Sequence, residues 1–175
     1  MIGCIVQARM GSTRLPGKVL KNIEKNKTVL DFVIKQLKES KLIDKIVVAT
    51  TDLEEDNKIV DYSKKIGIEC FRGDSENVLK RHYECARKFS MSTIVRIPSD
   101  KPLIDPTIVD QNIKFFSENS YDYVTNFLSK YTLPSGTEVE IFTYNALEIA
   151  YKNARLPSEK EHVTPYFPNH KNEFK

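Results

Sequence analysis

Apolar and polar positions follow two different periods along the chain. Short runs rich in β-branched and aromatic residues are typical of β-strands, and they cover residues 2–7, 45–51, 68–72, 93–97, 122–126 and 137–142. Longer segments repeat their apolar residues at helical spacing, and they cover residues 29–40, 54–66, 75–89, 106–119 and 145–153. In one of these helices Ile59, Tyr62 and Ile66 share a face, and Gly67 follows as a C-cap.

This alternation of strands and helices predicts an α/β fold, a mainly parallel sheet with helices on both faces. A length of 175 residues fits one domain. The polar stretch 21–27 is expected to be a solvated turn. Ligands of such sheets bind at the carboxyl ends of the strands. Functional residues are therefore expected after residues 7, 51, 72, 97 and 126.

Composition narrows the classes of partner. The net charge is +3, and cations and anions are interleaved along the sequence. Because the sequence has no basic stripe or block, a nucleic-acid partner is not expected. No apolar run approaches the ~20 residues that span a membrane, and the first residues lack the pattern of a signal peptide. The three cysteines are too widely spaced for a zinc site or a disulfide framework. We expect a cytoplasmic protein with reduced, buried cysteines.

The loop after the first strand carries the strongest chemical signal. Residues 8–18 contain two glycines, a proline, hydroxyl side chains, and the cations Arg9, Arg14 and Lys18. Exposed amides and fixed positive charges in a loop suit a triphosphate. The loop is not a Walker loop, because its glycines and lysine lack the required spacing. The alternative is a basic surface turn.

The sequence QARMGSTRLPGKVL (residues 7–20) resembles the signature loop of sugar-activating cytidylyltransferases, notably CMP-Kdo synthetases and the spore-coat-polysaccharide type. Residues 96–106 (RIPSDKPLIDP) and 161–166 (EHVTPY) extend the resemblance over nearly the whole chain. The resemblance implies a Rossmann-like, three-layer nucleotide-diphospho-sugar transferase fold with a mixed, mainly parallel sheet. It also implies that the loop binds nucleotide through Ala8, Arg9, Gly11 and Ser12, and that Arg14 and Lys18 are catalytic. Lys18 would stabilise charge developing on the α-phosphate.

Asp100 lies just after the fourth predicted strand, within a proline-flanked turn. From its spacing alone, the carboxylate is equally explained as a turn cap or a metal ligand. The resemblance identifies it as a catalytic Mg²⁺ ligand, a role suited to a hard oxygen donor facing a triphosphate. Pro98 and Ser99 differ from the residues that the family often has before this aspartate, so this segment leaves the choice of base open.

The segment that follows the third predicted strand has two interpretations. Asp74 or Ser75 would serve as the N-cap of the next helix, and Glu76 would suit the helix dipole. The resemblance instead places this region near the nucleobase, with Arg72 and Asn77 as contacts.

The sugar side of the site is predicted from the last third of the chain. Alternation places Glu138 and Glu140 on one strand face, either as paired acid–base groups or as a solvated surface. The resemblance assigns this region to the acceptor sugar, with Tyr131 and Glu138 as contacts. Ser158 and Glu161 form a capping-box pattern, and the adjacent His162 is either a sugar ligand or a surface histidine.

The leading hypothesis is therefore an enzyme that uses Mg²⁺ to transfer CMP from CTP to a sugar, with an acidic sugar as the expected acceptor, and that releases pyrophosphate. The alternatives are a guanylyl- or other sugar-1-phosphate nucleotidyltransferase, a nucleotide-binding remnant, and a glycosyltransferase, for which the expected DxD motif is missing. A homodimer is compatible with all of them. Relatives in the resembling family continue with a strand that supplies a second metal-binding aspartate and a closing helix. Residues 1–175 are expected to lack both, to bind nucleotide and to catalyse poorly.

Overall fold

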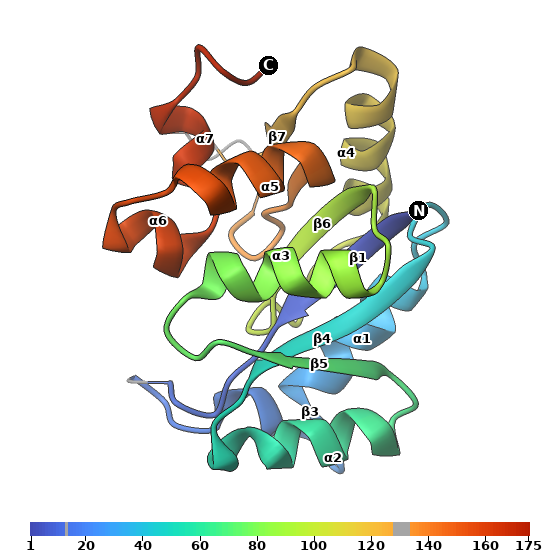
Figure 1. Ribbon diagram of the computed structural model, residues 1–175. Coiled ribbons are helices and arrows are strands. Elements are labelled where there is room, and N and C mark those ends of the chain that lie inside the picture. Colours follow the sequence, from blue (N-terminus) through green and yellow to red (C-terminus); the bar gives the residue numbers. More distant parts are fainter. Residues whose placement is uncertain (13, 128–133) are drawn as a thin grey trace.

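A six-stranded sheet in the order β5-β4-β1-β6-β8-β7 forms the centre of the molecule (Figure 1). This computed structural model describes residues 1–12, 14–127 and 134–175. Four neighbouring strands are parallel, and β8 runs antiparallel to both β6 and β7. The strands are β1 Ile2–Gln7, β4 Lys45–Thr51, β5 Glu69–Gly73, β6 Thr93–Pro98, β7 Tyr123–Thr125 and β8 Glu140–Thr143. The predicted mixed, mainly parallel sheet is confirmed.

Helices cover both faces of the sheet, which gives the three predicted layers. They are α1 Val29–Lys38, α2 Asn57–Lys65, α3 Val78–Lys88, α4 Pro106–Asn119, α5 Tyr144–Asn153, α6 Pro157–His162 and α7 Tyr166–Asn169. Side chains of β1 alternate between the layers: Cys4 and Val6 pack with α1, α2 and α4, whereas Ile5 packs with α3, α5 and α7. Among the helices that the described residues form, none is both long and apolar enough to cross a membrane.

Two segments form a different type of structure from the one predicted. The stretch predicted as a solvated turn contains a small hairpin of β2 Asn22–Glu24 and β3 Lys27–Thr28. Its turn includes Asn26 at φ 61°, a left-handed conformation that asparagine tolerates better than most residues. The helix predicted from residue 54 begins with the 3₁₀ turn η2 Glu54–Asp56 before α2. Both differences concern segments of two or three residues, which are too short to show a period.

A buried histidine in α3 predicts a pH-dependent stability. His82 is fully buried, and its Nδ1 lies 2.9 Å from the Val78 carbonyl oxygen. Burial, aided by the positive charge of Arg96, lowers the pKa of His82 well below its usual value. The folded protein therefore keeps the imidazole neutral at pH values where the unfolded chain binds a proton.

The free energy of unfolding should consequently fall as the pH drops below about 6.5, by up to about 1.4 kcal/mol per pH unit. Denaturant unfolding between pH 7 and pH 5 measures this slope. The variant His82→Gln should lose most of the slope, whatever its stability at pH 7. A slope equal to that of the wild type in this variant would show that other groups cause it.

Candidate functional site

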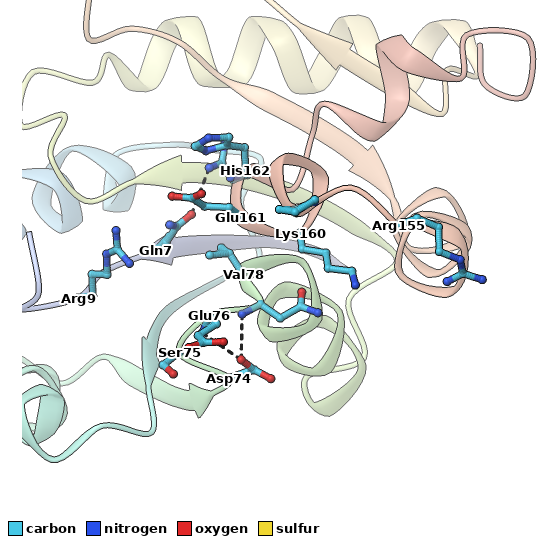
Figure 2. Close-up of a pocket in the computed structure, with 13 residues that line it drawn as sticks. Gln7, Arg9, Asp74, Ser75, Glu76, Val78, Arg155, Lys160, Glu161 and His162 are labelled. Atoms are coloured by element: carbon cyan, nitrogen blue, oxygen red, sulfur yellow. Dashed lines mark hydrogen bonds between the residues drawn. The ribbon is translucent and has the colours of Figure 1, made fainter.

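A polar cavity of about 680 Å³ lies at the carboxyl edge of the parallel strands (Figure 2). Residues at and after the ends of β1 and β5, together with Arg96 of β6, meet helix α6 there, at the edge where ligands of such sheets bind. The cavity is lined by Gln7, Arg9, Arg96, Arg155, Pro157 and residues 74–78 and 160–162. Figure 2 shows Glu161 and His162 on one side of it and Asp74–Glu76 on the other. Of the predicted contacts, Arg9, Asn77 and His162 are brought together here.

Hydrogen bonds hold the floor of the cavity in place. The Arg96 guanidinium donates to Gln7 Oε1 at 3.2 Å and forms an ion pair with Glu140. The Tyr123 hydroxyl donates to the other Glu140 oxygen at 3.0 Å. Burial, together with the Glu140 charge, raises the pKa of Tyr123. Glu140 thus orients the strand residues beneath the cavity, and it is not free to act as one of a pair of acid–base groups.

Backbone hydrogen bonds shape the loop that follows β1. Ala8, which is buried, donates its N–H to the Ala49 carbonyl at 3.1 Å. The Met10 carbonyl accepts the N–H groups of Ser12 at 2.7 Å and Gly17 at 2.9 Å. Gly17 has a φ of 67°, a left-handed conformation suited to glycine, and it leads into the 3₁₀ turn η1 Lys18–Leu20.

The two arginines of this loop are available to a ligand. Within the described part of the chain, neither the Arg9 nor the Arg14 guanidinium has a hydrogen bond or an ion pair with another residue. Arg9 lines the cavity. Arg14 lies further along the same loop, where its side chain is exposed and does not line the cavity. Thr13 lies outside the described residues. Cations without protein partners at a strand end favour an anionic ligand over a structural turn.

Lys18 and Asp100 are brought together although 82 positions separate them. Their ion pair is explained by the register of the sheet, in which Gln7 of β1 is opposite Pro98 of β6. The Ser99 N–H extends this pairing by donating to the Gln7 carbonyl at 3.0 Å. Neither Lys18 nor Asp100 lines the cavity itself, so they mark a second part of the site at the same edge.

The donor set at Asp100 fits a metal that arrives with its nucleotide. Among the described residues, no group of three or more histidine, cysteine, aspartate or glutamate side chains is arranged to hold a metal ion. Mg²⁺ in phosphate-transfer sites is commonly bound by one or two carboxylates, with waters and substrate phosphates as the other ligands. A single carboxylate such as Asp100 is compatible with that mode of binding.

The turn between β5 and α3 is shaped by Asp74. Its carboxylate accepts the N–H groups of Asn77 at 2.9 Å and Glu76 at 3.0 Å. The Asn77 hydrogen bond is the main cause that lowers the pKa of Asp74. The expectation that Asp74 or Ser75 is the N-cap of this helix is wrong, because the N-cap is Asn77, whose side chain accepts the Lys80 N–H at 2.9 Å. Asn77 therefore caps α3 and lines the cavity at once.

Arg72, the other predicted nucleobase contact, lies away from the cavity. Its guanidinium donates to the carbonyls of Thr51 at 3.1 Å and Leu53 at 3.0 Å, and to Asn57 Oδ1 at 2.7 Å. These bonds attach β5 to the connection between β4 and α2. The structure therefore separates Arg72 from Asn77 and uses it to fix a neighbouring segment.

The capping box predicted for Ser158 and Glu161 is wrong. Helix α6 begins at Pro157, so Ser158 lies inside it. The buried Glu159 instead accepts the N–H groups of Arg155 at 3.2 Å and Leu156 at 3.3 Å. Glu161 makes no capping hydrogen bond within the described part of the chain, and it lines the cavity.

A strained turn directs His162 toward the cavity. Val163 has φ 68° and ψ −60°, which is unusual for a β-branched residue. The Thr164 N–H donates to the His162 carbonyl at 2.8 Å, which closes a γ-turn. Val163 is fully buried while His162 is exposed at the cavity wall. Such strain costs about 1–3 kcal/mol and clusters at functional sites.

Glu138, another predicted sugar contact, does not line this cavity. The Glu138 carboxylate accepts hydrogen bonds from Lys101 Nζ at 2.7 Å and from the Gly136 N–H at 2.8 Å. Burial opposes ionisation of Glu138, but the hydrogen bonds from Lys101 and from backbone N–H groups, together with the Lys101 charge, outweigh it and hold the pKa below the usual value. Tyr131 lies outside the described residues.

Sequence reasoning missed several residues of the cavity wall. Gln7 is the last residue of β1 and Arg96 lies two residues before the end of β6, so their position near the carboxyl ends of the strands could have identified them. Arg155 precedes α6 and Lys160 lies within it. The six residues of this helix are too few to show a helical period in the sequence.

The sheet, the cation-rich loop and the cavity at the strand ends define a nucleotidyltransferase of Rossmann-like fold. A model of the Cytidylyltransferase family matches residues 3–175. The chain belongs to this family, and the family resemblance inferred from its motifs is confirmed.

Relatives in sequence and in structure agree with this assignment. The spore coat polysaccharide biosynthesis protein SpsF of Bacillus subtilis is 36% identical over 173 residues, which cover 95% of this chain and 69% of SpsF. The 3-deoxy-manno-octulosonate cytidylyltransferase of Trichlorobacter lovleyi is 36% identical over 120 residues, 67% of this chain and 46% of that enzyme. A cytidylyltransferase structure from Leptospira borgpetersenii has a TM-score of 0.92 at 37% identity, covering 99% of this chain and 73% of that one.

Proposed function

We propose that this nucleotidyltransferase transfers CMP from CTP to a sugar that carries an acidic group, with release of pyrophosphate. The observation that carries the proposal is the position of Arg9, which belongs to the cation-rich loop, lines the polar cavity and has no side-chain partner among the described residues. A triphosphate bound by this loop would place its nucleoside toward the cavity. The names of the relatives, a cytidylyltransferase for an acidic sugar among them, support CTP and a sugar as substrates.

Each part of the site has a function in this proposal. Arg9 and Arg14 neutralise the phosphates, since guanidinium groups bind phosphate oxygens in a forked geometry. Lys18 stabilises the negative charge that develops on the α-phosphate. Asp100 would hold Mg²⁺, which would supply further positive charge beside the phosphates when bound. The turn at Asn77 contributes hydrogen-bonding groups for the base.

The α6 wall suits an anionic acceptor. Arg155, Lys160 and His162 line the same cavity as Arg9, and cations at its wall would bind a sugar carboxylate. Glu161 adds an acceptor for sugar hydroxyls. In this arrangement the sugar lies across the cavity from the β5–α3 turn, with its hydroxyl directed to the α-phosphate.

Binding and turnover test the proposal separately. Calorimetric titration with Mg²⁺ and each of CTP, GTP, UTP and ATP should show the tightest binding for CTP. A pyrophosphate-release assay should then respond to sugar acids and not to the 1-phosphates of neutral sugars. Preference for GTP together with a sugar-1-phosphate would overturn the proposal in favour of a guanylyltransferase. CTP binding without release from any acceptor would indicate a nucleotide-binding protein.

A further inference from the structure

A buried carboxylate from another segment of the chain accepts a hydrogen bond from the cation-rich loop after β1, residues 8–18, which we call the nucleotide loop. Asp56, at the end of η2, is fully buried. Its Oδ1 accepts the Met10 N–H at 2.6 Å. Its Oδ2 accepts the Thr51 N–H at 3.3 Å and the Thr51 hydroxyl. Both carboxylate oxygens are therefore used, one for the loop and one for the end of β4.

The segment that carries Asp56 is itself fixed. Arg72 reaches from β5 and donates to the Thr51 and Leu53 carbonyls and to Asn57 Oδ1. Asp56 lies between Leu53 and Asn57 in the sequence, so these bonds hold the segment on both sides of it. The Met10 N–H is thus held by a carboxylate whose own position is set by two strands, β4 and β5.

The charge of Asp56 has a partner nearby. Arg81 of α3 is fully buried. The negative charge of Asp56 is one of those that raise the pKa of Arg81 and so favour its charged form. Burial and repulsion by Arg9 lower the pKa of Arg81 to about 10. The interaction among Arg9, Arg81 and Asp56 places this carboxylate within the electrostatic environment of the nucleotide loop.

We propose that Asp56 is a positioning residue that holds Met10, and with it Arg9, in the conformation that binds the triphosphate. This inference rests on the proposed function, because it assigns the loop to nucleotide binding. A loop that is ordered before its ligand arrives spends less free energy on ordering during binding. An aspartate is suited to the task, since hydrogen bonds to a charged acceptor are stronger than those between neutral groups.

The test compares Asp56→Asn with a matched control, Asp110→Asn. Asp110 of α4 likewise holds a loop by its backbone, accepting the N–H groups of Lys41 at 2.9 Å and Leu42 at 3.4 Å, outside the candidate site. The dissociation constant for CTP should rise at least ~10-fold in Asp56→Asn, the scale of losing one hydrogen bond to a charged acceptor. It should change less than ~2-fold in Asp110→Asn, where only an ordinary effect on stability is expected. Melting temperatures of both variants show whether their losses of stability are similar.

A second measurement does not require nucleotide. Amide hydrogen exchange, followed by NMR on the full chain, should show the Met10 N–H protected in the wild type and exchanging faster in Asp56→Asn. If Asp56→Asn does not fold, Thr51→Val keeps the carboxylate and removes the Thr51 hydroxyl, which donates to Asp56 and accepts the Leu53 N–H at 3.2 Å. That variant should weaken CTP binding by roughly 3-fold, less than one hydrogen bond to a charged acceptor.

Wild-type affinity in Asp56→Asn, or a loss no larger than in Asp110→Asn, would overturn the inference. Unchanged protection of Met10 would overturn it as well. A wild-type protein that binds none of the nucleoside triphosphates would instead overturn the proposed function. The exchange of the Met10 amide would still decide whether Asp56 holds the loop.

Discussion

Replacing Lys18 with alanine is expected to reduce turnover at least ~100-fold while the fold is retained, which is the scale of losing one donor that acts in the transition state. Lys18 lies on η1 at the end of the nucleotide loop and pairs with Asp100. The pair is partly exposed, with 29% and 40% of the two side chains accessible. Ion pairs of this kind contribute little to stability. A large loss of turnover would therefore reflect chemistry and not unfolding.

Lys45→Ala is the matched control for this variant. Lys45 forms an ion pair with Glu69 between β4 and β5, with 31% and 55% of the two side chains exposed. It lies at the opposite ends of the strands from the nucleotide loop. Pyrophosphate release under saturating CTP should be near normal in Lys45→Ala and strongly reduced in Lys18→Ala. Similar turnover in the two variants would contradict the assignment of Lys18.

The strands and long helices were predictable because each shows its own period. The α4 helix has a proline at its first position after an aspartate N-cap, so its start could be predicted. The start of α6 was missed although Pro157 gives the same signal. The pattern of Ser158 and Glu161 matched a capping box by spacing alone, and spacing does not show which residue has the backbone conformation of an N-cap.

The candidate site was predictable as far as strand ends define it. Gln7 and Pro98 are register partners, so the loop after β1 and the turn at Asp100 had to meet at one edge. The direction of a long side chain is a different matter. Arg72 stands at the end of β5 as predicted, but its guanidinium bonds to the β4–α2 connection, because carbonyls there lie within its reach. Only tertiary packing decides between these directions.

The wall formed by α6 had no signal in the sequence beyond His162. It depends on the γ-turn at Val163, which a β-branched residue does not favour. Burial of Val163 among α3, α5 and α7 compensates for the strain. A pattern based on local preference cannot predict a conformation that is stabilised by distant residues.

Asp100→Asn is expected to weaken Mg²⁺-dependent binding of CTP at least ~10-fold, because even residues that only support a metal ligand typically contribute 10- to 100-fold to metal affinity. The carboxylate follows β6 and faces Lys18, at the edge where the phosphates are proposed to bind. Asparagine keeps the shape of the side chain and removes its charge. Binding of CTP without Mg²⁺ should change much less, and it should even improve if loss of the anion releases Lys18.

Stability separates this role from that of a turn cap. Asp100 is 40% exposed and its ion pair is accessible to solvent, so the melting temperature without metal should barely change in Asp100→Asn. Glu69→Gln, which removes the anion of the Lys45 pair, provides the comparison. Titration calorimetry with and without Mg²⁺, beside thermal unfolding of both variants, gives the result. If Asp100→Asn melts far below Glu69→Gln without metal, and binds Mg²⁺ and CTP as the wild type does, the carboxylate is a structural cap of its turn.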